Sequence, residues 1–138
     1  MSVLRPGTVR CRRIVETDID ALVPLLARLF PSQPAPVWRR VFELLSARPA
    51  IGDYPRFGYL LACADAPVGV VLLIFSRMNS GPASYVRCNI SSWCVEPKYA
   101  AYGPMLIKVA TKIPDVTYFN ISPARHTLQT ITAQGFAC

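Results

Sequence analysis

The segment Asn89–Ile113, NISSWCVEPKYAAYGPMLIKVATKI, passes from a strand-like run through a loop into a helical pattern. The loop contains Pro97, small and aromatic residues and Gly103, and the helical pattern resumes at Pro104. The first turn of a helix presents backbone N–H groups without intrahelical partners and a partial positive charge, which suit an anion such as a phosphate. An ordinary strand-to-helix turn would have the same local pattern, so the segment alone leaves both interpretations open.

A few side chains could move a proton or receive an acyl group. His126 is the only histidine, and its ordinary pKa suits proton transfer near neutral pH. Ser91, Ser92 and Ser122 could hydrogen-bond an acceptor, and Cys94 could act as a nucleophile if a base lay near it and lowered its pKa. Each also has a structural interpretation, which the sequence favours: an exposed helical histidine, capping serines and a buried thiol.

The cysteine content argues against a metal centre. The five cysteines form no CxxC pair, and a single histidine accompanies them, so we expect no zinc site. Most lie in apolar, strand-like surroundings, where a free cysteine behaves as a small hydrophobic residue.

Composition indicates one globular domain over residues 1–138, since 52% of the residues are hydrophobic and 17% are charged. The longest apolar run, Ala66–Phe75, is too short to span a bilayer, and residues 1–13 lack a secretory-signal core, so we expect a cytoplasmic protein without a membrane partner. The net charge of +7 is spread along the chain, with Arg10–Arg13 as its one cluster. This favours anionic ligands, including phosphorylated cofactors, over nucleic acid.

Hydrophobic periodicity predicts the order β-α-α-β-β-β-α-β-α. Thr17 or Asp18 is expected to cap the first helix, and Pro24 to kink or shorten it. Val37, Val41, Leu44 and Leu45 are expected on one face of the second helix, and a tight turn at Asp65–Pro67. The predicted strands are Thr8–Val15, Phe57–Asp65, Pro67–Met78, Ser84–Glu96 and Asp115–Ser122, and the predicted helices lie within Glu16–Phe30, Val37–Ala47, Pro104–Ile113 and Pro123–Phe136.

This order predicts an α/β (α+β) fold with a mixed, mostly antiparallel central sheet and helices on both faces. The strand–helix–strand unit from Ser84 to Ser122 requires a parallel pair with a right-handed crossover, whereas the preceding strands form an antiparallel meander.

Together with three local patterns, the order of elements resembles the GCN5-related N-acetyltransferase (GNAT) superfamily. The run WCVEPKYAAYG resembles the family pattern V-x-P-x-[YF]-R-x-x-G-x-[GA], VTYFNIS is followed by a helix, and AQGF is similar to the Gly-Phe that closes the family's last helix. The resemblance extends from about Thr8 to Phe136 and depends on the combination of patterns.

The resemblance implies acetyl-CoA or another acyl-CoA as cosubstrate. In the family, the pantetheine arm pairs with the end of the fourth strand, and the loop before the next helix binds the pyrophosphate through backbone amides. The corresponding cofactor-binding residues here are Trp93, Cys94 and Val95 for the arm, and Tyr99, Ala100, Ala101, Tyr102, Gly103 and Met105 for the phosphates.

The loop departs from the family pattern at two positions. Ala100 replaces the usual Arg or Gln, and Met105 replaces the second Gly or Ala. Backbone amides can still bind phosphate, and Lys98 and Lys108 are candidates to supply the charge that Ala100 lacks.

The family's catalytic positions also differ. Asn89 lies where many members have a glutamate base, and it could orient a water but cannot take a proton at neutral pH. Ile131 lies where many have a tyrosine acid. His126, beside the family's cofactor cleft, and Tyr118, on the fifth strand, are the candidate substitutes.

The expected function is an acyl-CoA-dependent N-acyltransferase, most simply an acetyltransferase, that acts on a primary amine by direct transfer. The alternatives are a catalytically inactive domain of this fold that binds acyl-CoA or a partner protein, and a basic nucleic-acid-binding module. The region Phe30–Pro55 should contribute to the acceptor pocket, but its sequence specifies no acceptor.

The family usually adds two strands after the Gly-Phe, whereas this sequence stops at Cys138. We therefore expect either a fragment or a homo-oligomer in which another chain covers the open edge of the fifth strand.

Overall fold

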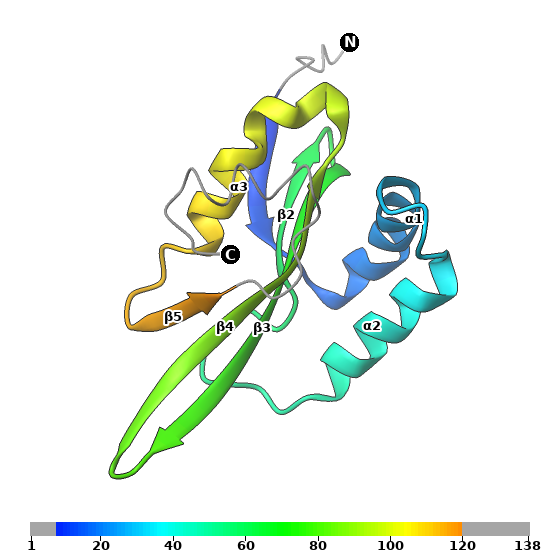
Figure 1. The fold of residues 1–138 in the computed structure, drawn as a ribbon. Helices are drawn as coiled ribbons and strands as arrows, with labels where there is room; N and C mark the ends of the chain where they lie inside the picture. The colour runs from blue at the N-terminus through cyan, green and yellow to red at the C-terminus, as the bar shows by residue number, and fades with distance from the viewer. Residues whose placement is uncertain (1–7, 120–138) are drawn as a thin grey trace.

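The computed structural model describes residues 8–119, which form one five-stranded sheet with helices on both faces (Figure 1). The strands lie in the order β1-β2-β3-β4-β5. They are β1 (Val9–Arg13), β2 (Gly58–Cys63), β3 (Ala66–Ser80), β4 (Ala83–Val95) and β5 (Val116–Phe119), and the helices are α1 (Ile19–Leu29), α2 (Ala35–Ala47) and α3 (Gly103–Ala110), with 3₁₀ turns η1 (Glu16–Asp18) and η2 (Pro97–Tyr102).

Strand pairing confirms the predicted mixed sheet. β1 to β4 form an antiparallel meander, and β5 runs parallel to β4 after the α3 crossover. The predicted end of the fifth strand at Ser122 and the last predicted helix, with His126 and Ile131, lie outside the described residues. Self-association through the outer edge of β5 stays a prediction.

A β-bulge interrupts the pairing of β3 and β4. Leu72 lies opposite Ser92, whereas the next residue, Leu73, lies opposite Ile90, so Ser91 is an extra residue on β4. An extra residue reverses the alternation of side chains along a strand. Cys88 and Ile90 accordingly face the α3 side before the bulge, Trp93 faces that side after it, and Cys94 faces α1 and α2.

The core therefore has two layers, one on each face of the sheet. On the α1/α2 side, α2 buries Trp38, Phe42 and Leu45, while Val37 and Leu44 are 38% and 51% exposed. The predicted apolar face of this helix was wrong at those two positions. The aromatic residues fill the interior instead, with the Trp38 and Phe30 ring centroids 5.4 Å apart.

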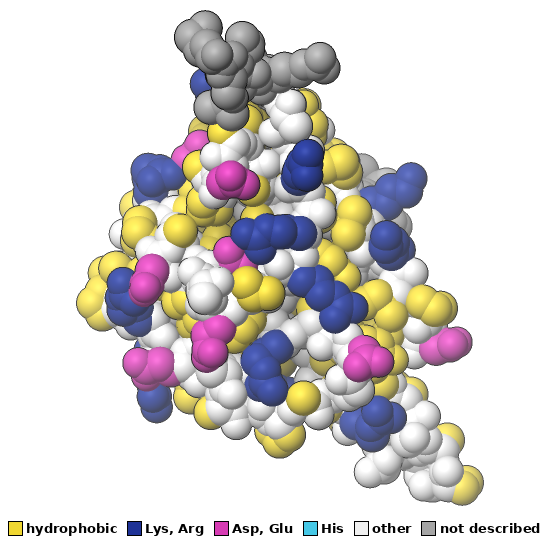
Figure 2. Space-filling model, turned by 180° about the vertical axis from the view of Figure 1, so that it is seen from behind, with side chains coloured by type: hydrophobic (Ala, Val, Ile, Leu, Met, Phe, Trp, Pro, Cys, Tyr) yellow, Lys and Arg dark blue, Asp and Glu magenta, His cyan; other side chains and the backbone are white. Residues whose placement is uncertain are grey.

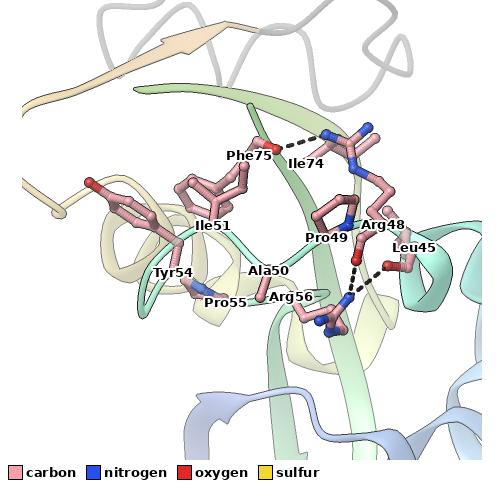
Figure 3. A pocket seen from close by; sticks show the side chains of 10 residues that line it. All are labelled: Leu45, Arg48, Pro49, Ala50, Ile51, Tyr54, Pro55, Arg56, Ile74 and Phe75. Carbon is pink, nitrogen blue, oxygen red and sulfur yellow. Dashed lines mark hydrogen bonds between the residues drawn. The ribbon is translucent and has the colours of Figure 1, made fainter. Parts of the chain in front are cut away.

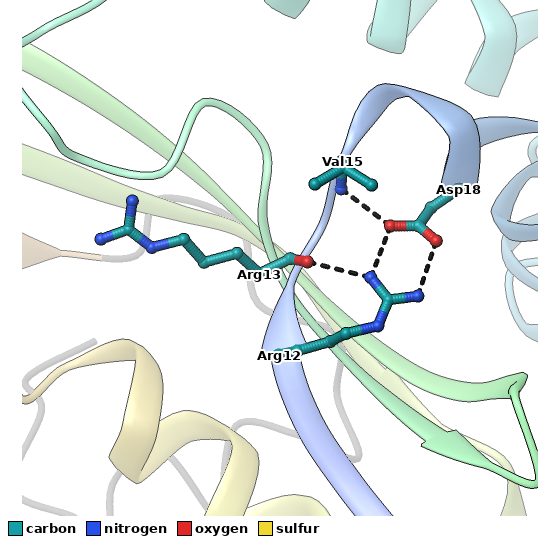
Figure 4. A network of polar contacts seen from close by, with 4 residues as sticks. All are labelled: Arg12, Arg13, Val15 and Asp18. Carbon is teal, nitrogen blue, oxygen red and sulfur yellow. Dashed lines mark hydrogen bonds and ion pairs between the residues drawn. The ribbon is translucent and has the colours of Figure 1, made fainter.

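The start and course of α1 differ from prediction in two ways. The helix continues through Pro24, which is exposed, so the predicted shortening was wrong. Asp18 does not cap α1 with its side chain. Its carboxylate instead accepts bonds from both terminal nitrogens of Arg12, at 2.8 Å each, and from the Val15 amide, at 2.7 Å (Figure 4). These bonds connect β1 to η1 and hold the pKa of Asp18 below its ordinary value, chiefly through Arg12.

The C-terminus of α2 is closed by Arg56, which lies just before β2. Its guanidinium donates to the carbonyl oxygens of Leu45, Ser46 and Arg48 at 3.3, 3.2 and 2.6 Å. A positive charge at this helix end also interacts favourably with the helix dipole. No helix within residues 8–119 is long and apolar enough to cross a membrane.

We expect Asp18→Asn to lower the free energy of unfolding at neutral pH by about 1 kcal/mol, because Arg12 is half exposed and solvent screens the pair. A depressed carboxyl pKa stabilises the fold above the ordinary pKa, and this stabilisation is lost as the pH falls through the lower folded value. Urea unfolding at several pH values should thus show the difference shrinking in acid. Asp115→Asn, at an exposed turn, is the control. An unchanged difference from neutral to strongly acidic pH would contradict this.

Gly58 is the second stability test, because a Cβ at this position would lie 2.0 Å from the Val71 carbonyl oxygen and φ is +130°. We expect Gly58→Ala to unfold the protein or to cost more than about 3 kcal/mol. Gly81→Ala, in the β3–β4 turn with φ +61° and nothing within 4 Å, should cost only about 1 kcal/mol. Thermal melts of the two variants would compare them, and equal losses would refute this account of Gly58.

Candidate functional site

The end of β4 and the first turn of α3 form one packed unit. The Glu96 amide donates to the Val68 carbonyl oxygen at 2.8 Å, which ends the pairing of β4 with β3. Gly103 is buried, and a Cβ there would lie 3.8 Å from both Trp93 and Val95. The small residue therefore lets the N-terminus of α3 approach the sheet closely, on the side where Trp93 and Val95 project.

The backbone of the loop is more ordered than the sequence predicts. Residues 97–102 form η2, in which the Tyr99 amide donates to Glu96 O at 2.8 Å and the Gly103 amide donates to Ala100 O. Pro104 has no N–H to give. The amides of Tyr99 and Gly103 are thus engaged within η2, and the assignment of this loop to the phosphates stays a prediction.

The side chains of the loop are mostly accessible. Ala100, Ala101 and Met105 are exposed, while Tyr99 and Tyr102 are half-buried. Lys98 is exposed, and its Nζ lies 5.8 Å from the centroid of the Tyr99 ring, so one positive charge is held over η2. Lys108 lies in the last turn of α3, at the opposite end of the helix from this loop.

β4 has a strand on each side. β3 pairs with β4 from Ala83 to Val95, and β5, which is described as far as Phe119, pairs with Val86–Asn89. The following stretch of β4, Ile90–Val95, begins at the bulge and is separated from η2 by Glu96 alone, so it leads directly to α3.

The three residues expected to contact the arm do not share a face. Trp93 and Val95 pack on the α3 side, and Cys94 on the α1/α2 side. Burial raises the pKa of Cys94 to about 12, and the pKa of Cys88 is also raised to about 12 by burial. Neither thiol is poised to act as a nucleophile.

The described catalytic candidates also lie on opposite faces. Asn89 pairs with Ile74, which belongs to the α1/α2 side, and its Oδ1 is buried with no hydrogen-bond partner among the described residues. Tyr118 pairs with Cys88 on the α3 side, and burial raises its pKa well above the ordinary value. The structure does not bring these two side chains together.

Sequence reasoning missed an ion pair at the edge of this region. Arg28, in the last turn of α1, pairs with Glu96 at the end of β4. The two residues are 68 positions apart, so no local pattern links them. The pair ties α1 to the point where β4 leaves the sheet.

Two hollows in the described surface lie away from the β4–α3 junction. A cavity of about 30 Å³ lies between α2, the following loop and β3, and its lining includes Arg48, Tyr54 and Phe75 (Figure 3). An open groove of about 460 Å³ lies between η1 and α2, lined in part by Glu16 and Arg39. On the face drawn in Figure 2, basic side chains alternate with acidic and hydrophobic ones and form no single patch.

Comparison with solved structures identifies the fold as that of acetyltransferases. The aminoglycoside N-acetyltransferase AAC(6′)-Iy in complex with CoA superposes with a TM-score of 0.67 at 13% identity, over 99% of this chain and 93% of that one. A Trypanosoma brucei acetyltransferase gives 0.68 at 17% identity, over 94% and 93%. AAC(6′)-Iy with a CoA–acetylneamine bisubstrate analogue gives 0.68 at 14% identity, over 96% and 92%.

These matches confirm the predicted fold, which this chain shares with solved acetyltransferases. No protein-family model matches the sequence, and no curated protein matches it at a significant level.

The burial of Cys88 and Cys94 predicts unequal thiol reactivity. At pH 8, with alkylating reagent in excess, both should remain unmodified in the folded protein, because a pKa near 12 leaves almost no thiolate. Cys11 and Cys63, which are half-buried, should react before these two. Peptide mass mapping after a timed exposure would measure this, with the urea-unfolded protein as control. Early alkylation of Cys94 would show that its site is open.

Proposed function

We propose that this chain is a single-domain, acyl-CoA-dependent N-acyltransferase that transfers an acyl group, most simply acetyl, to a primary amine. The observation that carries the proposal is the path from β4 through η2 into α3, on a fold shared with acetyltransferases. The buried Gly103 lets the N-terminus of α3 lie close to Trp93 and Val95 at the end of β4. An extended ligand with amide groups could run along the end of β4 and place its phosphates at the helix.

The donor fits this arrangement. Acyl-CoA has a pantetheine arm with two amide groups, suited to hydrogen bonds with the backbone at the end of β4, and a pyrophosphate, suited to helix amides and Lys98. The fold shared with AAC(6′)-Iy, whose structures contain CoA and a CoA bisubstrate analogue, supports the same ligand here. We assign Trp93, Cys94 and Val95 to the arm through their backbone. The phosphate contacts are assigned to η2 and the first turn of α3: the amides of Ala100, Ala101, Tyr102 and Met105, with Tyr99 and Gly103 shaping the turn.

The proposed reaction is direct. The amine lone pair attacks the thioester carbonyl carbon, a C–N bond forms, the C–S bond breaks, and CoA leaves as a thiolate that takes a proton. A backbone N–H near Val95 would stabilise the oxyanion. Asn89 Oδ1 would accept a hydrogen bond from the amine and orient it, while water carries its proton away. Cys94 forms no acyl intermediate, and His126 remains the candidate acid, whereas Tyr118 faces the other side of the sheet.

A second candidate is a domain that binds acyl-CoA without turnover. Asn89 in place of a carboxylate base and Ala100 in place of an Arg or Gln favour this alternative. Titration calorimetry with CoA and acetyl-CoA, followed by thiol release with a panel of amines, separates the two. Binding without thiol release from any amine supports the second candidate, and absence of binding at millimolar concentration removes both.

A pair of matched variants tests the position of the donor site. Met105 and Leu44 are both exposed apolar residues, at 38% and 51%, and Met105 lies in the first turn of α3. We expect Met105→Glu to weaken CoA binding by at least about tenfold, because a carboxylate there repels the phosphates. Leu44→Glu, on α2, should leave the affinity unchanged. Calorimetry with both variants measures this, and equal affinities would exclude phosphate binding at α3.

A further inference from the structure

A group of polar side chains lies on the α1/α2 side of the β3–β4 pair. Ile74, Ser76 and Met78 alternate on one face of β3, and they pair with Asn89, Arg87 and Tyr85 of β4. Residues directly opposite each other in an antiparallel pair project to the same side. Because Ile74 packs in the α1/α2 layer, all six face that side.

Two arginines converge on this surface from different elements. Arg48, which follows α2, donates to the carbonyl oxygen of Phe75 at 2.8 Å and to Ser76 Oγ at 3.1 Å. Figure 3 shows its side chain lying beside Ile74 as it reaches β3. Arg87 lies directly opposite Ser76, and its guanidinium carbon is 4.4 Å from the centroid of the Phe119 ring. Arg48 therefore reaches Ser76 itself, whereas the Arg87 guanidinium lies over Phe119 of β5, and the contacts of each guanidinium leave donors free.

Within residues 8–119, neither Arg48 nor Arg87 forms an ion pair with a carboxylate. Four carboxylates of and near the helices are engaged elsewhere: Asp18, Asp20, Glu43 and Glu96 each pair with a different arginine. Two like charges held on one surface favour an anion, and an arginine guanidinium suits a carboxylate or a phosphate through two parallel hydrogen bonds.

The same face holds an amide oxygen, Asn89 Oδ1, for which the described residues supply no hydrogen-bond donor. Asn89 Oδ1 is buried and has no hydrogen-bond partner among the described residues, which is an unfavourable state for an amide oxygen. Asn89 is two residues from Arg87, about 6–7 Å along the strand. It also immediately precedes the stretch of β4 to which the acyl donor is assigned. An amine N–H at Asn89 would thus lie close to the thioester.

We propose that the acceptor is a small primary amine that also carries an anionic group, a carboxylate or a phosphate, a few atoms from its nitrogen. Its anion binds Arg87, while Arg48 adds positive charge to the same face, and its amine donates to Asn89 Oδ1. This assignment rests on the proposed transferase function and deepens it. It also sets the chain apart from the aminoglycoside enzymes of the same fold, because a polycationic acceptor would be repelled by the two arginines.

Matched ligands test the assignment without requiring turnover. Binding of phosphoethanolamine, β-alanine, ethanolamine and β-alaninamide to the full chain would be followed by NMR titration, with and without CoA. We expect at least one anionic amine to bind at least about tenfold more tightly than its neutral counterpart, and the two pairs distinguish phosphate from carboxylate. Equal binding of anionic and neutral amines, or no binding of the anionic ones, would overturn the assignment.

Two arginine variants on the same hairpin supply the control. Arg87→Gln should remove the preference for the anionic amine. Arg77→Gln removes the same charge but pairs with Val86 on the α3 side, so it should keep the preference. Circular dichroism checks that both variants fold. Arg48→Lys keeps the positive charge but not the paired hydrogen-bonding geometry of a guanidinium. This variant should therefore bind the anionic amine more weakly while the sheet stays folded, which is an independent test. Equal effects of Arg87→Gln and Arg77→Gln would reject the subsite.

Turnover separates this inference from the proposed function. If thiol release from acetyl-CoA occurs with kanamycin or ethanolamine as readily as with phosphoethanolamine and β-alanine, the transferase function is supported and the anionic subsite is rejected. If anionic amines bind and their binding requires Arg87 while CoA does not bind at all, the subsite is supported and the transferase function is rejected.

Discussion

The antiparallel pairing of β3 with β4 is the interaction on which the other features depend. It extends over the full length of β4 and contains one irregularity, the extra residue Ser91. Because the bulge reverses the alternation, Ile90 and Trp93 can both face α3 although they are an odd number of residues apart. The same reversal turns Cys94 toward α1, where it joins the other core layer. A regular strand would have pointed one of these residues into the wrong layer.

The order of elements could be predicted from the sequence because each strand and helix carries its own hydrophobic period. The buried face of α2 could not, since two stripes satisfy the same helical spacing. One contains Val37 and Leu44, and the other contains Trp38 and Phe42. In the structure the larger rings are buried, because they pack in the core beside α1. The Phe42 and Phe57 ring centroids lie 5.8 Å apart. The bulge could not be predicted either, because the neighbouring serines are compatible with either register of β4 against β3.

The candidate site was predicted unevenly for a similar reason. The sequence located the β4–α3 junction, since that junction is local and ends in a recognisable proline and glycine. It did not locate Arg48 beside Ser76, because the loop after α2 and the middle of β3 meet only when the sheet is formed. Alternation along β4 could have placed Arg87 and Asn89 on one side, but only strand register shows that Arg87 lies opposite Ser76, to which Arg48 donates. Long-range register is what a single sequence leaves undetermined.

The role of Arg56 constrains how the chain could vary. This side chain, just before β2, donates to three carbonyl oxygens at the end of α2. The length of the loop between α2 and β2 is therefore limited by the distance that the arginine side chain can span. Added or deleted residues between them would leave the helix end open and shift β2 along its neighbours. The β3–β4 tip at Gly81 has no such tether among residues 8–119 and projects from the body of the molecule (Figure 1). Related chains should therefore differ in length at the hairpin and agree in length between α2 and the sheet.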